Sequence, residues 1–217
     1  MSWEVFDKMY ERYEEWFDSF PGKGIFEVEV KCVKESLKEV PKPWLEIGVG
    51  TGRFAEKAGI DFGIDPSEKM LNKAIKRKIK VIKANAENLP FPSNIFGGIA
   101  IIVTLCFLDN PSRALKECFR VLKNKGKIVL GIVPRESKWG EFYLKKKKEG
   151  HPFYSIAHFY TVREAVSLSE KVGFKLENIF STLFEQPENC QDIKPYPPLP
   201  EYTKNAGFVC IKLEKPG

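Results

Sequence analysis

The chain has 217 residues, of which 43% are hydrophobic, 13% aromatic and 29% charged. This length suffices for one domain with a full hydrophobic core, and the composition excludes a disordered or fibrous protein. The 35 basic and 29 acidic residues give a net charge of +6, which permits contact with nucleic acid but does not favour it.

The chain carries no obvious membrane or metal signal. Its longest apolar stretch, residues 99–108, is too short to cross a bilayer, and the first residues lack the pattern of a secretory signal. The five cysteines lie far apart without Cys-x-x-Cys spacing, so we expect neither a zinc site nor a disulfide framework. These features predict a cytoplasmic protein without a membrane span.

Apolar spacing predicts the elements in chain order. Residues 3–20 carry large apolar side chains at helical spacing, and a second helix is expected over residues 26–37. From residue 44 onward strands alternate with helices, which is typical of a parallel α/β sheet. The expected strands cover residues 44–47, 62–65, 79–82, 98–105, 127–133, 174–183 and 207–213. The expected helices between them lie near residues 53–57, 70–75, 110–122 and 161–173.

A glycine-rich loop follows the first expected strand, with Gly-Val-Gly-Thr-Gly at residues 48–52. Glycines let a ligand lie against the backbone, and the next helix offers free N–H groups. Asp65 ends the next strand, 17 positions after Gly48, where a carboxylate binds a ribose diol in such folds. Arg53 occupies the sixth position of the dinucleotide fingerprint, and no P-loop Gly-Lys pair follows. The pattern therefore indicates an adenosine-like ligand without a phosphate cradle.

Four segments together resemble the motifs of class I S-adenosylmethionine-dependent methyltransferases, in the same order and spacing. They are Leu-Glu-Ile-Gly-Val-Gly-Thr-Gly-Arg-Phe at 45–54, Gly-Ile-Asp-Pro-Ser-Glu-Lys-Met at 63–70, Ala-Asn-Ala-Glu-Asn-Leu-Pro-Phe at 84–91, and the helix and turn at 113–126. The resemblance covers about residues 40–180. It is nearest to the small single-domain type 11 subgroup, which includes quinone-biosynthesis C-methyltransferases with widely varying substrates.

The resemblance implies a Rossmann-like α/β fold. Its sheet has seven mostly parallel strands with helices on both faces and an antiparallel last strand. We expect one methyltransferase domain over residues 1–217, made of four parts. These parts are a helical N-terminal cap (1–40), a cofactor-binding core (41–133), a variable lid (134–160), and a C-terminal helix with a strand hairpin (161–217).

The resemblance also implies roles for residues around S-adenosylmethionine, which would leave as S-adenosylhomocysteine. The glycine loop and Glu46 would hold the methionine part, Asp65 the ribose, and the remaining residues the adenine and the sulfonium. The expected cofactor-binding residues are Glu46, Gly48, Gly50, Thr51, Gly52, Asp65, Pro66, Ser67, Met70, Asn85, Ala86, Glu87, Thr104 and Leu105. Two positions depart from the family pattern, because Asn85 and Gly97 stand where aspartates are common.

Methyl transfer from a sulfonium is an in-line displacement, so no covalent nucleophile is required, and a base helps only if the acceptor must lose a proton. The candidates for such a base are His158 and Tyr13, with His151 ranked lower. Tyr13 also fits core packing. Arg53 is interpreted either as a partner of the cofactor carboxylate or as a surface residue. The aromatic residues of 139–154 would line an apolar substrate pocket or pack the lid.

The favoured acceptor is a small molecule, because the variable segments are short. An RNA or protein methyltransferase is the alternative, and a basic stripe joining residues 145–148 to the pocket would support it. A nucleoside-binding module without catalysis and a nicotinamide oxidoreductase remain as further alternatives, although Arg53 argues against the latter. The oligomeric state and the acceptor atom are left open.

Overall fold

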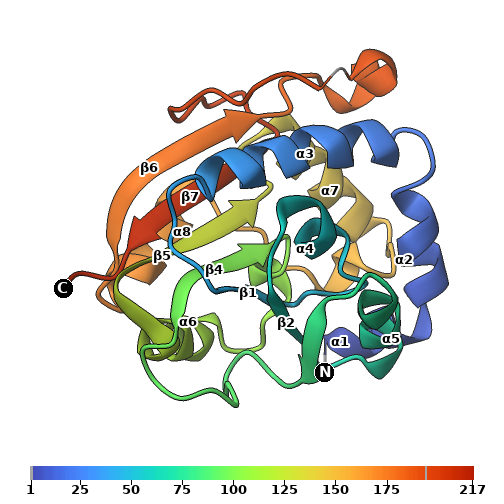
Figure 1. Ribbon diagram of the computed structural model, residues 1–217. Coiled ribbons are helices and arrows are strands. Elements are labelled where there is room, and N and C mark those ends of the chain that lie inside the picture. The colour runs from blue at the N-terminus through green and yellow to red at the C-terminus, as the bar shows by residue number, and fades with distance from the viewer. Residues whose placement is uncertain (1, 194) are drawn as a thin grey trace.

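The computed structural model describes residues 2–193 and 195–217, with the side chains of residues 191 and 192 excluded. Seven strands form one sheet in the order β3-β2-β1-β4-β5-β7-β6 (Figure 1). The pairs from β3 to β5 are parallel, whereas β7 runs antiparallel to both β5 and β6. This arrangement confirms the predicted Rossmann-like sheet. The strands are β1 (Trp44–Ile47), β2 (Phe62–Asp65), β3 (Lys80–Lys83), β4 (Phe96–Ile102), β5 (Leu122–Ile132), β6 (Lys175–Thr182) and β7 (Phe208–Glu214).

Helices cover both faces of the sheet, as expected for a parallel sheet with crossover connections. Helices α3, α4 and α5 contribute to the hydrophobic cluster on one face, and α6 and α8 to the cluster on the other (Figure 1). The α-helices are α1 (Trp3–Lys8), α2 (Tyr10–Trp16), α3 (Gly22–Ser36), α4 (Arg53–Ala58), α5 (Glu68–Lys76), α6 (Pro111–Val121), α7 (Lys138–Lys148) and α8 (Val162–Glu170). The short 3-10 helices are η1 (Leu105–Phe107), η2 (Tyr154–Ile156) and η3 (Pro187–Asp192).

The central strand β4 explains the apolar run seen in the sequence, because all of its residues are buried. Side chains alternate across a strand, so each face of the sheet receives every second residue. Ile99 and Ile101 join Leu115 of α6 in one cluster, while Ala100 and Ile102 belong to the cluster on the opposite face. Both clusters therefore depend on β4. A shift of this strand by one residue would move its side chains to the opposite faces, so burial on both faces fixes its register.

Local signals place the helix starts where the sequence predicts them. The Asn110 side chain accepts a hydrogen bond from the Arg113 amide, and Pro111 occupies the first helical position. At α8, Thr161 and Glu164 form the reciprocal capping box. These side chains satisfy amides that the first turn of a helix leaves without partners.

Several boundaries differ from the prediction, among them the following three. The expected single helix over residues 3–20 is broken at Met9 into α1 and α2. Strand β4 ends at Ile102 rather than residue 105, because Val103 adopts a left-handed φ of 49° and η1 follows. The expected loop over residues 184–204 contains η3, and its residue 194 lies outside the described residues.

The break at Met9 lets the two N-terminal helices meet different parts of the core. On α1, the Asp7 carboxylate accepts a hydrogen bond of 2.7 Å from the Ser67 hydroxyl at the start of α5. On α2, Glu14 accepts a hydrogen bond of 2.9 Å from Arg53 at the start of α4. None of the helices that the structure describes combines the length and the hydropathy that a membrane crossing requires.

Leu115 provides a test of the packing of α6 on the sheet. Its side chain is 0% exposed, so we expect Leu115→Ala to lower the free energy of unfolding by about 2–5 kcal/mol. Ile75 on α5 is 56% exposed, and Ile75→Ala should change it by no more than about 0.5 kcal/mol. Urea denaturation of both variants checks the prediction, and equal stabilities would show that α6 is not packed as described.

Candidate active site

The carboxyl ends of β1, β2 and β4 meet at one edge of the sheet, where ligands of open α/β folds bind. The loops that follow these strands line a cavity of about 890 Å³. Helices α1 and α2 contribute side chains to the same cavity from the other side. The cavity therefore lies between the glycine loop and the N-terminal helices.

The backbone conformation favours glycine at all three loop positions, and the surroundings differ between Gly48 and Gly50. All three have left-handed φ values, of 70° at Gly48, 52° at Gly50 and 82° at Gly52, and such values are costly for other residues. A Cβ on Gly48 would lie 2.3 Å from the Thr104 side chain, so this glycine allows the loop to pack against the end of β4. A Cβ on Gly50 would meet only Tyr13, at 3.8 Å. Gly50 is thus the position where the backbone faces the cavity.

Asp65 holds the glycine loop in place from the end of β2. Its Oδ2 accepts a hydrogen bond from the Gly50 amide and its Oδ1 accepts one from the Ser67 amide, both at 2.9 Å. Burial raises the pKa of Asp65 to about 6, although these two hydrogen bonds act in the opposite direction. The carboxylate also lines the cavity, where each of its oxygens has a further lone pair for a ligand.

The structure brings most of the sequence-predicted cofactor residues to the cavity and leaves four outside its lining. Those that line it are Gly48, Gly50, Asp65, Pro66, Met70, Asn85, Ala86, Glu87, Thr104 and Leu105. Those that do not are Glu46, Thr51, Gly52 and Ser67. Two of these four begin helices beside the cavity. Gly52 is the N-cap residue of α4, and the Ser67 side chain caps α5 by accepting a hydrogen bond from the Met70 amide.

Glu46 is the carboxylate expected at the methionine end of the cofactor, but it lies beneath the loop. It is 2% exposed, and one of its carboxyl oxygens has no hydrogen-bond partner among the described residues. Burial raises the pKa of Glu46 well above its usual value, with a further contribution from the negative charge of Asp65. Any effect of Glu46 on a ligand must therefore pass through the loop.

Arg53 anchors the second N-terminal helix, and this finding corrects both interpretations made from the sequence. Its guanidinium lies 2.8 Å from the Glu14 carboxylate and 2.5 Å from the Asp18 carboxylate. Arg77, which follows α5 directly, pairs with the same Glu14 oxygen. Arg53 and Glu14 are 14% and 15% exposed, so the pair is largely shielded from water and ties α2 to the glycine loop.

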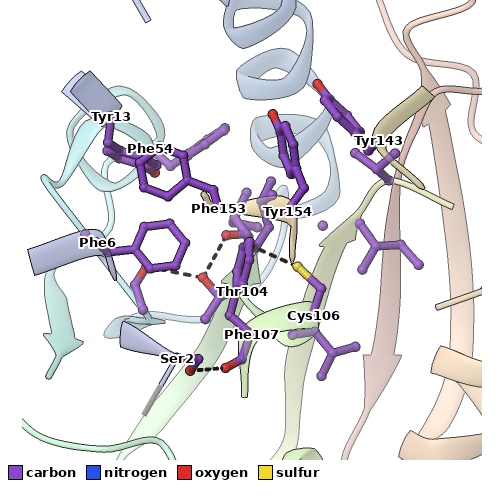
Figure 2. A pocket seen from close by; sticks show the side chains of 18 of the residues that line it. Ser2, Phe6, Tyr13, Phe54, Thr104, Cys106, Phe107, Tyr143, Phe153 and Tyr154 are labelled. Carbon is purple, nitrogen blue, oxygen red and sulfur yellow. Dashed lines mark hydrogen bonds between the residues drawn. The ribbon is translucent and has the colours of Figure 1, made fainter. Parts of the chain in front are cut away.

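Aromatic side chains pack α1 against two loops that border the cavity. Figure 2 shows Phe6 beside Phe107 and Phe153, with ring centroids 4.8 and 5.1 Å away. The Ser2 hydroxyl donates a hydrogen bond of 2.6 Å to the Phe107 carbonyl. The first helix therefore contacts both the loop after β4 and the segment before η2.

The two predicted base candidates occupy different places. His158 is exposed, does not line the cavity, and packs edge-on against Tyr160 with centroids 4.6 Å apart. Tyr13 lines the cavity, but burial and the charges of Glu46 and Asp65 raise its pKa. The Tyr13 phenol is therefore protonated at neutral pH, which does not favour a role as proton acceptor.

His151, ranked below His158 from the sequence, does line the cavity. Its ring stacks on Tyr154 at 4.4 Å, and its Nδ1 has no hydrogen-bond partner among the described residues. Burial lowers its pKa, and the charges of Arg12 and Lys146 add to this effect. The nearby thiol of Cys106 is not a nucleophile at neutral pH, because burial raises its pKa to about 12.

Beyond Thr104 the cavity is walled mainly by aromatic side chains. They belong to α7, to η2 and to the residues next to η2, namely Trp139, Phe142, Tyr143, Phe153, Tyr154 and Phe159. This part of the cavity is called the aromatic lobe below. Of the two sequence interpretations for residues 139–154, the structure supports both, because these rings pack on one another and line the cavity.

Glu29 on α3 also lines the cavity and was missed by the sequence reasoning. A signal for it was present: Ile25, Glu29 and Val33 follow one another at steps of four, which places them on one helix face. The other two are buried apolar residues. A carboxylate on such a stripe is unusual enough to be a candidate for a functional group.

Comparisons with known proteins identify the family. Residues 45–130 match a family described as a methyltransferase domain. An uncharacterized protein of Methanocaldococcus jannaschii is 38% identical over 97% of this chain and 98% of its own length. A demethylmenaquinone methyltransferase of Thermotoga maritima is 30% identical over 83% of this chain and 90% of its own. A crystal structure from Thermotoga maritima, described as a SAM-dependent methyltransferase and possible histamine N-methyltransferase, is 37% identical. It has a TM-score of 0.90 and covers 99% of this chain and 100% of that chain.

The chain belongs to the S-adenosylmethionine-dependent methyltransferases. S-adenosylmethionine is therefore the methyl donor of this methyltransferase, and S-adenosylhomocysteine is the product that it releases. Membership of this family also decides against the nicotinamide oxidoreductase considered from the sequence.

The Arg53 anchor gives a testable prediction for the methyltransferase. Arg53→Ala removes charged hydrogen bonds worth about 1.5–3 kcal/mol each, so amides of residues 10–19 should exchange with solvent at least about tenfold faster. Hydrogen exchange followed by mass spectrometry measures this. Lys57→Ala, at a more exposed position of α4, is the control, and equal protection in both variants would show that the ion pair does not hold α2.

Proposed function

We propose that this methyltransferase transfers its methyl group to a small-molecule acceptor held in the aromatic lobe. The observation that carries this proposal is the continuity of one cavity, of about 890 Å³, from Asp65 to Tyr143. Small-ligand sites are commonly clefts of about 300–1,000 Å³ with mostly apolar walls and a few polar groups. One cavity of this size accommodates a donor and a small acceptor together.

The residues at the sheet edge fit the donor. In this proposal, the Asp65 carboxylate accepts from the ribose hydroxyls with the lone pairs that Gly50 and Ser67 leave free. The methionine part lies against Gly50, where no side chain blocks the backbone. Pro66, Met70 and the lining residues of 85–87 border the adenine. The remaining predicted residues, Glu46, Thr51, Gly52 and Ser67, support this arrangement without lining it.

The chemistry requires alignment more than it requires reactive side chains. The bound donor supplies an electrophilic methyl group, and the displacement proceeds in line with the sulfur. Thr104 and Leu105 follow the end of β4 and line the cavity, and the Thr104 side chain packs against Gly48 of the glycine loop. Holding both reactants in such a position contributes up to about 7–11 kcal/mol to lowering the barrier. Helices α1 and α2 contribute further side chains to the cavity, among them Phe6 and Tyr13.

The small size of the acceptor follows from how the cavity is covered. Phe6, Phe107 and Phe153 pack together over it, so a large polymer would have to displace α1. The lysine run offers little to a nucleic acid, because Lys146 pairs with Glu149 and Lys147 donates to the Ala157 carbonyl. The named relatives act on different acceptor types, one a demethylmenaquinone and one possibly histamine, so their names do not choose the acceptor.

The donor site is tested by calorimetric titration with S-adenosylmethionine, S-adenosylhomocysteine and NAD. We expect both sulfur nucleosides to bind and NAD not to bind. Asp65→Ala should raise both dissociation constants at least about tenfold, since each hydrogen bond to a charged group contributes about 1.5–3 kcal/mol. Asp65→Asn keeps the size of the side chain, so its dissociation constants should lie between those of the wild type and those of Asp65→Ala. Undiminished binding by folded Asp65→Ala would remove Asp65 from the site.

The affinity for S-adenosylmethionine should also depend on pH. The ionised Asp65 carboxylate is the better acceptor for two hydroxyls, and its pKa is about 6. At pH 5 only about a tenth of the carboxyl groups with that pKa are ionised, so the dissociation constant should be about tenfold higher at pH 5 than at pH 7.5. Titrations across this range measure the effect. Asp65→Asn is the control, and a slope that persists in this variant would assign the effect to another group.

A further inference from the structure

Glu29 is a charged residue on the buried, apolar side of α3. Its neighbours at helical spacing, Ile25 and Val33, are 1% and 0% exposed, and Glu29 itself is 5% exposed. The little surface that it retains faces the cavity, which it lines together with Ile25. A glutamate in this environment is rare, because glutamate is almost never fully buried unless it is paired.

The carboxylate of Glu29 has no partner among the residues that the structure describes. It makes no hydrogen bond or ion pair with any residue that the structure describes. Burial alone raises its pKa to about 8. A buried charge without a partner is expensive, so the free protein favours the protonated carboxyl. The ionised form becomes favourable when a cation enters the cavity.

The arginine and the lysine that line the cavity do not supply that cation. Arg12 is exposed on α2. Lys146 lies 3.1 Å from Glu149, and its ammonium is 5.7 Å from the centre of the Phe142 ring. Neither forms an ion pair with Glu29.

The surroundings of Glu29 in the aromatic lobe suit an organic cation. Figure 2 shows Tyr143 and Tyr154 side by side with their hydroxyl groups pointing the same way, and their ring centroids are 4.5 Å apart. The ring centroids of Trp139 and Tyr143 are 5.9 Å apart. Burial raises the pKa of Tyr154 to about 12, and the negative charge of Glu29 contributes to that increase. Aromatic faces attract cations, so the rings and the carboxylate favour the same kind of ligand.

We propose that Glu29 binds a protonated amine of the acceptor, so that the substrates are small amines with an apolar body. The ammonium group supplies the positive charge and the hydrogen-bond donors that Glu29 lacks. The apolar body of the acceptor packs against the rings of the aromatic lobe. This inference rests on the proposed function, because it names the acceptor of the same cavity.

The test compares amines with alcohols of the same shape. The protein is saturated with S-adenosylhomocysteine and titrated with 2-phenylethylamine and 2-phenylethanol, and then with n-hexylamine and n-hexanol. We expect the wild type to bind at least one amine about tenfold or more tightly than its alcohol. Glu29→Gln should abolish that preference, whereas Glu27→Gln, at an exposed position of the same helix, should retain it.

Two further readouts separate the possible failures. Glu29→Gln should melt at the same temperature as the wild type or higher, because it replaces a buried carboxyl without a partner by a neutral amide of similar size, so a lost preference is not a folding defect. Equal binding of amine and alcohol, or no binding of either, by the wild type saturated with S-adenosylhomocysteine overturns the inference while leaving the donor site intact. Failure of the wild type to bind S-adenosylhomocysteine is instead a failure of the proposed function.

The donor itself carries a positive sulfonium, which is the competing partner for Glu29. S-adenosylmethionine has this charge and S-adenosylhomocysteine does not. If Glu29 binds the acceptor, Glu29→Gln should change the two dissociation constants by the same factor, within about twofold. A variant that weakens S-adenosylmethionine tenfold and leaves S-adenosylhomocysteine unchanged would assign Glu29 to the sulfonium and overturn the inference.

Discussion

The site depends on the two backbone hydrogen bonds that Asp65 accepts. One comes from Gly50 in the loop after β1 and the other from Ser67 before α5, so a single carboxylate joins two neighbouring crossover connections. Because each oxygen uses one lone pair for the fold, the side chain is held rigidly while still able to accept from a ligand. The same group therefore builds the cavity wall and presents a charge to the cavity. Burial of the ionised carboxylate costs free energy, and the raised pKa of Asp65 reflects that cost.

The electrostatics of the free protein follow the same pattern elsewhere in the site. Asp65, Glu46 and Glu29 all have a raised pKa, and in each case burial is the largest cause. A carboxyl whose pKa is higher in the folded than in the unfolded state contributes most to stability below the unfolded pKa. That contribution is lost as the pH rises through the folded value, which is about 6 for Asp65 and about 8 for Glu29. Burial therefore favours the protonated form of Glu29 at neutral pH, and a cation that enters the cavity would favour its ionised form.

Sequence patterns were sufficient for the parts of the molecule that local chemistry determines. The alternation of strands and helices, the capping box at Thr161 and the buried run of β4 could all be predicted, because each depends on neighbouring residues. The pairing of Arg53 with Glu14 could not be predicted, because the two residues are 39 positions apart in the sequence. Likewise His158 and His151 looked similar in the sequence, and only the packing of the segment around η2 placed His151 at the cavity.

The N-terminal helices leave part of their apolar surface without protein to cover it. Among residues 3–16, which the structure describes in full, no side chain is fully buried, although Trp3, Phe6 and Tyr13 all line the cavity. Burial of apolar surface is the main source of helix stability in proteins. In the proposed function, the donor and the acceptor would cover this apolar surface, so occupancy of the site and order of the first two helices would be coupled.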